Sequence, residues 1–369
     1  MLGRTLKAQL ILENGLTFTG EAFGYLKETT GEVVFYSGSA GYQETITDPA
    51  LADKLVVMTY PLVGNYGVNL DDDESDVPRL RGLIVRESCD MPNNWRCEME
   101  LESFLKQHKI VGIKGVDTRA LTRAIRDNGA MKGMITTRFA EMTESQIAQK
   151  FQNYSEKVDL SAMTCAEKYV LDNKGKHVAV IDLGLRKSML KELQARGLKL
   201  TVFPGTANFD EIMAVAPQGV IVSSGASILE DEALTKNVVA TVKQIVDAKM
   251  PVAGLGIGYC VVAMALGCGV NKLKYGSHGA SYAVKDSKTG RLYTTAQNID
   301  YAVDANALAE GVEVLMTAVN GGSVEAIRHK AVPAYAVKFM PETLKCKEAG
   351  TGFVYDTIMS VLEEGKANA

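Results

Sequence analysis

Several residue types are scarce in this sequence of 369 residues, and their scarcity excludes some classes of protein. The six cysteines form no CxxC pair and have no histidine at zinc-ligand spacing, so the sequence predicts no metal site. We interpret them as the reduced thiols of a cytoplasmic protein. Positive charge is not in excess either, because the formal net charge is −4. We therefore expect no surface that binds nucleic acid.

Long apolar runs are also missing from the sequence. No run reaches the roughly 20 residues that a membrane-spanning helix needs. The segment from Met1 to Lys7 lacks the apolar core of a secretory signal. We expect neither a membrane span nor export. Apolar residues make up 46% and charged residues 23% of the chain, as in ordinary globular proteins. The length favours about two domains, each able to bury a core.

The stretch 251–267 contains the most informative pattern, and it too is defined by something missing. An apolar segment leads into Gly254-Leu-Gly256-Ile-Gly258, and an Ala- and Val-rich segment follows. This layout is typical of a nucleophile elbow, a strand-to-helix turn that strains one residue and exposes its side chain. The apex residue, Gly256, has no side chain. The sequence therefore predicts an elbow without its nucleophile.

Residues 1–150 are predicted to form a β-rich domain. Strands are predicted at 8–12, 17–20, 32–36 and 54–60, and helices at 99–108 and 117–126. The turn signal Glu13-Asn-Gly15 predicts a hairpin between the first two strands. The segments 37–49 and 61–69 have the composition of loops, and we interpret the acidic run 71–75 as a solvated loop.

From residue 177 onward, strands and helices alternate. Strands are predicted at 177–181, 200–203, 219–222 and 252–255, and helices near 186–197, 208–215, 231–249 and 354–364. This alternation is typical of βαβ units with a buried parallel sheet. After residue 268 we expect shorter β segments. The largely polar residues 151–176 are assigned to the connection, which places the second domain at 177–369.

Short motifs in both halves occur in the order in which one known family carries them. In the first half they are Gly31-Glu-Val-Val-Phe35, Gly41-Tyr-Gln-Glu44, Thr47-Asp-Pro49, Gly64-Asn-Tyr-Gly-Val-Asn69, Asn94-Trp-Arg96 and Asp117-Thr-Arg-Ala-Leu-Thr122. In the second half they are Asp182-Leu-Gly184, Lys272-Leu-Lys-Tyr-Gly276, Gln297-Asn298, Val324-Glu-Ala-Ile-Arg-His-Lys330 and Pro341-Glu342. On these motifs the sequence resembles the small chain of carbamoyl-phosphate synthase, whose second domain is a class I glutamine amidotransferase. The resemblance implies a β-rich domain followed by an α/β domain with a central, mostly parallel sheet.

The resemblance also implies glutamine hydrolysis by a Cys nucleophile, a His base and an orienting Glu. The sequence departs from the family at these positions. The family's Cys falls at Gly256 and its His at Met340, whereas the Glu is kept as Glu342. Glycine cannot attack an amide carbon, and methionine has no titratable proton. We therefore predict that the glutaminase activity is lost.

Other positions that the resemblance connects with the substrate are partly kept and partly altered. We interpret Gly225, Ile257, Asn298 and Tyr301 as remnants of the substrate-binding site, although packing and turn roles suffice to explain Gly225 and Asn298. The altered positions are Ala50, Ser227, Cys260 and Asp300.

Three functions stay open on the sequence. The first is a non-catalytic small subunit, paired with an ATP-grasp large chain that makes carbamoyl phosphate from free ammonia, for arginine or pyrimidine biosynthesis. The second is a working glutaminase whose nucleophile has moved to Cys260, a residue better explained as a small buried hydrophobe. The third is a stand-alone binding or regulatory protein. The resemblance implies that ATP and Mg²⁺ belong to the large chain, so no cofactor is expected in this one.

Overall fold

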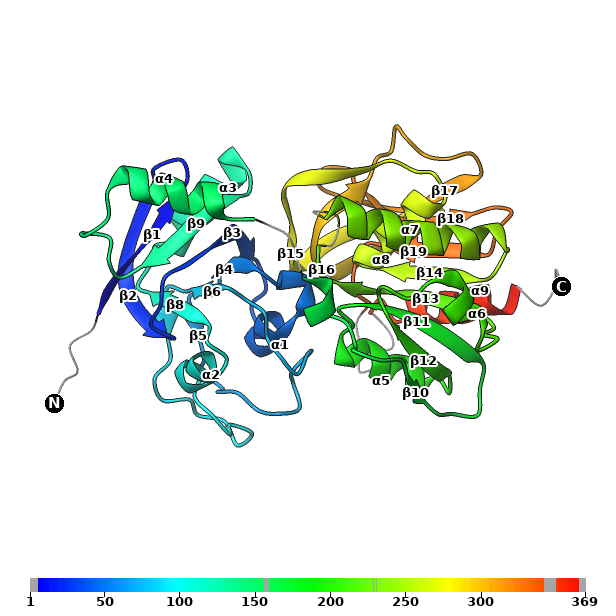
Figure 1. The fold of residues 1–369 in the computed structure, drawn as a ribbon, viewed down its shortest axis with the longest axis horizontal. Helices are drawn as coiled ribbons and strands as arrows, with labels where there is room; N and C mark the ends of the chain where they lie inside the picture. The colour runs from blue at the N-terminus through cyan, green and yellow to red at the C-terminus, as the bar shows by residue number, and fades with distance from the viewer. Residues whose placement is uncertain (1–5, 156–158, 228, 230, 342–349, 365–369) are drawn as a thin grey trace. The chain divides into compact units, whose positions relative to one another are not determined.

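The computed structural model describes residues 6–155, 159–227, 229, 231–341 and 350–364. The chain divides into two compact units, Met1–Glu156 with Lys274–His278, and Lys157–Leu273 with Gly279–Ala369. The first unit is rich in strands and the second is an α/β unit (Figure 1). The predicted fold class is therefore confirmed. No pattern in the sequence indicated that residues 274–278 return to the first unit.

The first unit is built around a closed β-barrel. Its strands, in their order around the barrel, are β1 (Lys7–Leu12), β2 (Thr17–Gly24), β8 (Val111–Lys114), β6 (Gly82–Ile84), β4 (Lys54–Met58), β3 (Thr29–Tyr36) and β9 (Met131–Thr136). The predicted hairpin is present, since β1 and β2 pair antiparallel across the turn at 13–16. Apolar side chains such as Leu10, Val33 and Leu55 form a buried cluster. Closure leaves these strands without the free edges that favour aggregation.

Helices complete the first unit. They are α1 (Tyr42–Thr47), a 3₁₀ helix at Pro49–Leu51, α2 (Leu101–Gln107), α3 (Thr118–Asn128) and α4 (Glu144–Asn153). The prediction that 37–49 is a loop was wrong, because α1 lies within it. Gly41 precedes α1 with φ 76°, a backbone conformation that favours glycine. The Asp48 carboxylate accepts a hydrogen bond from the Ala50 amide and caps the 3₁₀ helix. The turn-forming residues here act as helix caps.

The second unit contains a ten-stranded sheet among the residues described. The strands in sheet order are β10 (Tyr169–Leu171), β12 (Lys199–Pro204), β11 (His177–Leu183), β13 (Val220–Gly225), β14 (Val252–Leu255), β19 (Ala334–Val337), β18 (Val324–His329), β17 (Val312–Ala318), β15 (Val270–Asp286) and β16 (Leu292–Val303). From β12 to β19 neighbouring strands are parallel, and on both sides of this block the pairing becomes antiparallel. The predicted parallel sheet is thus the centre of a mixed one.

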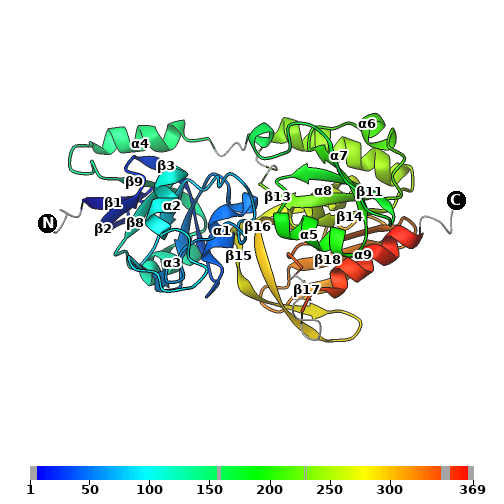
Figure 2. The same ribbon diagram turned by 90° about the horizontal axis from the view of Figure 1, so that it is seen from below.

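Helices cover both faces of this sheet (Figure 2). On one face, α6 (Phe209–Met213), α7 (Glu232–Asp247) and α8 (Ile257–Ala265) contribute side chains to a single apolar cluster. On the other, α5 (Lys187–Ala195) and α9 (Phe353–Glu364) contribute to a second. The alternation of β-branched strands with amphipathic helices produces this three-layer arrangement.

Two expectations for the second unit need correction. The segments after 268 were expected to be short, but β15 spans 17 residues and β16 spans 12. Polar residues occur throughout both strands, and in β16 some of them, such as Gln297 and Asp300, are buried, so apolar periodicity does not mark the strands. Strand β10 lies within the segment 151–176 that was assigned to the connection, and it pairs with β12. The second unit therefore begins before residue 177.

Candidate functional site: a strand-to-helix elbow

The elbow predicted from the glycine pattern is present between β14 and α8. Gly256 has φ 57° and ψ −122°, a combination that side-chain-bearing residues rarely adopt. A Cβ atom on Gly254 would overlap the Gly258 carbonyl oxygen, and one on Gly258 would overlap that of Val222. The sequence folds into this turn because glycine alone permits such close backbone approach.

Gly256 faces Met340, which follows β19. An ideal Cβ on Gly256 would lie 3.4 Å from Met340 Sδ and 3.1 Å from Ser224 Cβ. Met340 is buried, and its backbone N–H donates to the Ala296 carbonyl oxygen at 2.8 Å. Tertiary structure thus brings positions 256 and 340 together, although 83 residues of chain lie between them. Glu342 lies outside the described residues.

Gly225 is the last residue of β13 and follows Ser224, whose Cβ lies close to Gly256. A Cβ on Gly225 would overlap the Leu183 carbonyl oxygen, so no larger residue fits there. The neighbouring Ser224 is 1% exposed, and its hydroxyl has no hydrogen-bond partner within the part of the chain that the structure describes. By contrast, Ser223 Oγ accepts from the Leu183 N–H at 2.9 Å. Sequence reasoning missed Ser224 because a serine at a strand end carries no signal of its own.

The remaining residues assigned to the substrate-binding site divide into two groups. Ile257, the first residue of α8, and Tyr301, on β16, belong to the apolar cluster under the sheet, and Asn298 lies on the same strand β16. Two of the altered positions bond to each other, since Ser227 Oγ donates to Asp300 Oδ2 at 2.9 Å with both residues buried. The Asp300 carboxylate is thereby held by a residue of this chain.

Cys260, the alternative nucleophile, lies in α8 and is 0% exposed. It belongs to the apolar cluster that α8 shares with the sheet. Burial raises the pKa of its thiol well above the ordinary value, and the nearby Lys338 ammonium lowers the pKa only in part. A thiol in this environment stays protonated at neutral pH, and the protonated form is a poor nucleophile.

A buried ion pair that sequence reasoning missed lies two residues before Met340. Lys338 Nζ is 2.9 Å from Glu325 Oε1, and the two side chains are 1% and 0% exposed. Gln297 donates to the other carboxylate oxygen at 2.8 Å, and Ser323 donates to the first at 2.8 Å. A lysine inside an apolar strand is almost never fully buried unless it is paired. The lysine between Val337 and Phe339 was therefore a sequence signal for a buried ion pair.

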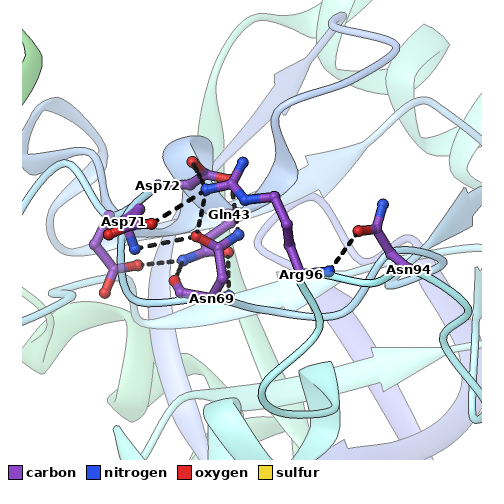
Figure 3. A network of polar contacts seen from close by, with 7 residues as sticks. Gln43, Asn69, Asp71, Asp72, Asn94 and Arg96 are labelled. Atoms are coloured by element: carbon purple, nitrogen blue, oxygen red, sulfur yellow. Dashed lines mark hydrogen bonds and ion pairs between the residues drawn. The ribbon is translucent and has the colours of Figure 1, made fainter.

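In the first unit, motifs from three separate stretches meet in one polar network (Figure 3). Gln43 Oε1 accepts from the Asn69 N–H at 3.0 Å, and Asn69 Nδ2 donates to Asp72 Oδ2 at 2.7 Å. Arg96 donates to Asn69 Oδ1 at 3.1 Å and to Asp72 Oδ1 at 3.0 Å. Residues from three motifs that are separate in the sequence thus form one polar network.

The network corrects the interpretation of residues 71–75 as a solvated loop. Asp71 is exposed, but Glu74 is buried, and the Glu74 N–H donates to Thr47 Oγ1 at 2.9 Å. The Ser75 hydroxyl donates to the Thr47 carbonyl oxygen at 2.7 Å. Acidic composition alone cannot show that a loop is fixed by backbone and hydroxyl contacts to α1.

Two kinds of site are not found in the described part of the chain. No group of three or more His, Cys, Asp or Glu residues among the described positions could hold a metal ion. No described helix is both long and apolar enough to cross a membrane.

A parallel-centred sheet covered by helices on both faces, with an elbow at the end of β14, defines a class I glutamine amidotransferase type of domain. In agreement, residues 179–360 match the family model "Glutamine amidotransferase class-I", and residues 10–135 match "Carbamoyl-phosphate synthase small chain, CPSase domain". The chain belongs to the carbamoyl-phosphate synthase small chain family.

Individual relatives support this membership. The chain is 43% identical over 337 residues to a carbamoyl phosphate synthase small chain of Clostridium perfringens, covering 91% of this chain and 94% of the relative. It is 37% identical to that of Bacillus caldolyticus, with 97% of each chain covered. It is 36% identical to a pyrimidine-specific small chain of Halalkalibacterium halodurans, with 99% of each covered.

Proposed function

We propose that this chain is the non-catalytic small subunit of a carbamoyl-phosphate synthase, paired with a large chain that takes its nitrogen from free ammonia. The observation that carries the proposal is the meeting of Gly256 and Met340 at the elbow, where a Cβ would lie 3.4 Å from the sulfur. The resemblance assigns the family's nucleophile to position 256 and its base to position 340, and neither Gly256 nor Met340 carries a group that can do that chemistry.

The surroundings of the elbow support loss of turnover. In a serine protease, removal of the nucleophile or the base alone lowers turnover by about 2 × 10⁶. Here both groups are replaced. Ser224 carries a hydroxyl close to the apex, but this hydroxyl has no hydrogen-bond partner among the described residues, and a serine without a base is a weak nucleophile. Ser227 and Asp300, two positions that the resemblance connects with the substrate and that differ from the family, bond to each other, which further supports loss of glutamine binding.

The relocated nucleophile is the weaker candidate, because Cys260 is fully buried in an apolar cluster and its pKa is raised. A substrate could reach the thiol only if α8 left the sheet. The first unit argues against a stand-alone binding protein. Residues of its family motifs still form an ordered hydrogen-bond network.

The test is reconstitution with the large chain encoded in the same genome. We expect a stable complex that makes carbamoyl phosphate from bicarbonate, ATP and ammonium, and that makes none when glutamine replaces ammonium. A family member whose own sequence has Cys and His at the two corresponding positions, assayed with its own large chain, serves as the positive control for the glutamine assay. Glutamine-dependent synthesis by this chain would overturn the proposal, and the absence of any complex would favour the stand-alone protein.

A further inference from the structure

A pocket in the first unit is lined almost entirely by polar side chains. Its volume is about 320 Å³, near the lower end of the range for sites that hold small molecules. One wall is the helix α4, which contributes Gln146, Gln149, Lys150 and Asn153. Neighbours on this wall are three or four residues apart, the spacing that places side chains on one face of a helix. We call this site the α4 pocket.

The opposite wall of the α4 pocket comes from the barrel, where Thr136 connects two charged residues. Strands β3 and β9 pair antiparallel, with Thr29 opposite Ile135. Glu28 precedes β3, and Arg138 lies two residues after β9. The buried Thr136 hydroxyl donates to Glu28 Oε2 at 3.2 Å and accepts from the Arg138 N–H at 3.0 Å. The pairing of the two strands thus fixes the positions from which both charged side chains line the pocket.

Apolar contacts hold α4 against the barrel. Phe151, on the face of α4 that turns away from the pocket lining, belongs to a buried cluster with Ile11 of β1 and Met134 of β9. Lys150 Nζ lies 3.4 Å from Glu28 Oε1 and joins the two walls. The pocket is therefore present in the folded chain before any ligand arrives, which lowers the entropy that binding would cost.

The chain itself uses little of the hydrogen-bonding capacity of this pocket. Arg138 donates through Nε to Glu141 Oε2 at 3.0 Å, and the N–H groups of its two Nη atoms remain. The side-chain amides of Gln149 and Asn153 have no hydrogen bond to any residue that the structure describes. The unused groups include more N–H donors than oxygen acceptors. They are suited to a ligand that is rich in acceptor oxygens.

The charges of the lining favour a negative ligand. Arg138 and Lys150 are cationic, and Glu28 is the carboxylate among the lining residues. Lys150 already compensates Glu28. Arg138 is paired with Glu141, which is not part of the lining, and both side chains of this pair are more than half exposed. Such an exposed pair contributes little free energy, so an anion in the pocket can share or replace it.

We propose that the α4 pocket binds a small hydrophilic oxyanion, a carboxylate or a phosphate monoester that also carries hydroxyl groups. The anionic oxygens would accept from the Nη atoms of Arg138, which present two parallel N–H groups to such a ligand. The Lys150 ammonium would add a second positive charge, and the amides of Gln149 and Asn153 would bind the hydroxyls. All of these residues belong to the first unit, so the inference does not depend on the proposed function.

Gluconate, glucose 6-phosphate and glucose are a matched set of probes, because they have the same number of carbon atoms and differ in the charged group. We would titrate each into the full chain by isothermal titration calorimetry. We expect at least one of the two anions to bind, and glucose to bind about tenfold more weakly or not at all. The affinity for the anion should fall as the salt concentration rises.

Variants identify the pocket as the place of binding. Arg138→Gln should weaken binding of the anion by about tenfold or more, because it removes a charged hydrogen-bond donor. Asn153→Ala should weaken it by a smaller factor, because it removes a neutral one. Both residues are exposed, so we expect both variants to fold. Arg123→Gln, at an exposed arginine of α3 outside the pocket, removes the same charge and should bind as the wild type does.

The outcomes distinguish the two kinds of oxyanion and decide the inference. Binding of gluconate alone would identify a carboxylate site, and binding of glucose 6-phosphate alone a phosphate site; either supports the proposal. Glucose bound as tightly as the anions would show that the pocket does not recognise charge, which contradicts it. The inference also fails if no probe binds, if Arg138→Gln binds as the wild type does, or if Arg123→Gln weakens binding equally.

Discussion

A Cβ atom on Gly256 would lie 3.4 Å from the sulfur of Met340. The two residues therefore occupy neighbouring positions across the elbow, as a nucleophile and its base would have to. Gly256 has φ 57° and ψ −122°. This backbone conformation would strain any residue that carries a side chain. The backbone forms the strand-to-helix elbow, and neither of the two residues that face each other across it carries a nucleophilic or basic side chain.

Glutamine hydrolysis by the purified chain should be absent. The physical reason is that neither Gly256 nor Met340 can form or relay the bonds of acyl transfer. Ammonia release from glutamine, followed with a coupled glutamate dehydrogenase assay, should not exceed the buffer rate. Cys260→Ala is the companion variant. Ammonia release that this variant abolishes would show that the nucleophile has moved.

Restoring the two side chains should produce a reactive thiol but little turnover. Gly256→Cys places a Cβ in a strained backbone region, which should cost about 1–3 kcal/mol of the free energy of unfolding. With Met340→His added, iodoacetamide should label the new thiol at position 256, as peptide mapping would detect. Turnover should stay low because Ser227 and Asp300, at positions that the resemblance connects with the substrate, are altered and bond to each other, and misplacement of a substrate alone can cost about 100-fold. Efficient glutamine hydrolysis would show that the pocket had never lost its substrate.

Gly225→Ala should destabilise the second unit strongly. The new Cβ would overlap the Leu183 carbonyl oxygen, a backbone atom that cannot turn away as a side chain could. We expect a loss of about 3 kcal/mol or more of the free energy of unfolding, measured by urea denaturation. Gly352→Ala is the control, since nothing lies within 4 Å of its added Cβ. Equal stability of the two variants would contradict the close approach.

Removing only one partner of the buried ion pair should lower the free energy of unfolding strongly. Lys338→Met leaves the Glu325 carboxylate buried without its cation and should cost about 3–5 kcal/mol. Adding Glu325→Gln should recover most of this loss, because no unpaired charge then remains. Lys330→Met removes an exposed pair with Glu313 and should change stability by no more than about 1 kcal/mol. A double variant as unstable as the single one would argue against an electrostatic cause.

Ionisation of the Cys260 thiol should lower the free energy of unfolding at alkaline pH. Because its pKa in the folded state is raised, the folded chain keeps a proton that the unfolded chain releases. The contribution to stability is present below the ordinary thiol pKa of 9.0 and is lost as pH rises from there toward the folded value. Cys260→Ala should flatten the fall in stability above that pH, by up to about 1.4 kcal/mol per pH unit. The same thiol should resist alkylation until urea unfolds the chain.

The local patterns were sufficient for most of the second unit. The βαβ alternation predicted β11, β12, β13 and β14 with the helices between them, because buried parallel strands need continuous apolar runs. The glycine pattern predicted the elbow for a similar reason, since only glycine fits where backbones touch. The patterns failed for α1 and for the long strands β15 and β16, whose residues carry too little apolar periodicity to mark them.

The sequence by itself determined the family, the elbow and the absence of a side chain at its apex, since each depends on residues that are neighbours along the chain. Only the tertiary structure decided which distant residues meet. Met340 reaches Gly256 because β19 pairs parallel to β14, Ser227 finds Asp300 on β16, and Lys338 is paired with Glu325 across the register of β18 and β19. Strand order and register set these contacts, and both are fixed by packing of the whole sheet and not by any local stretch.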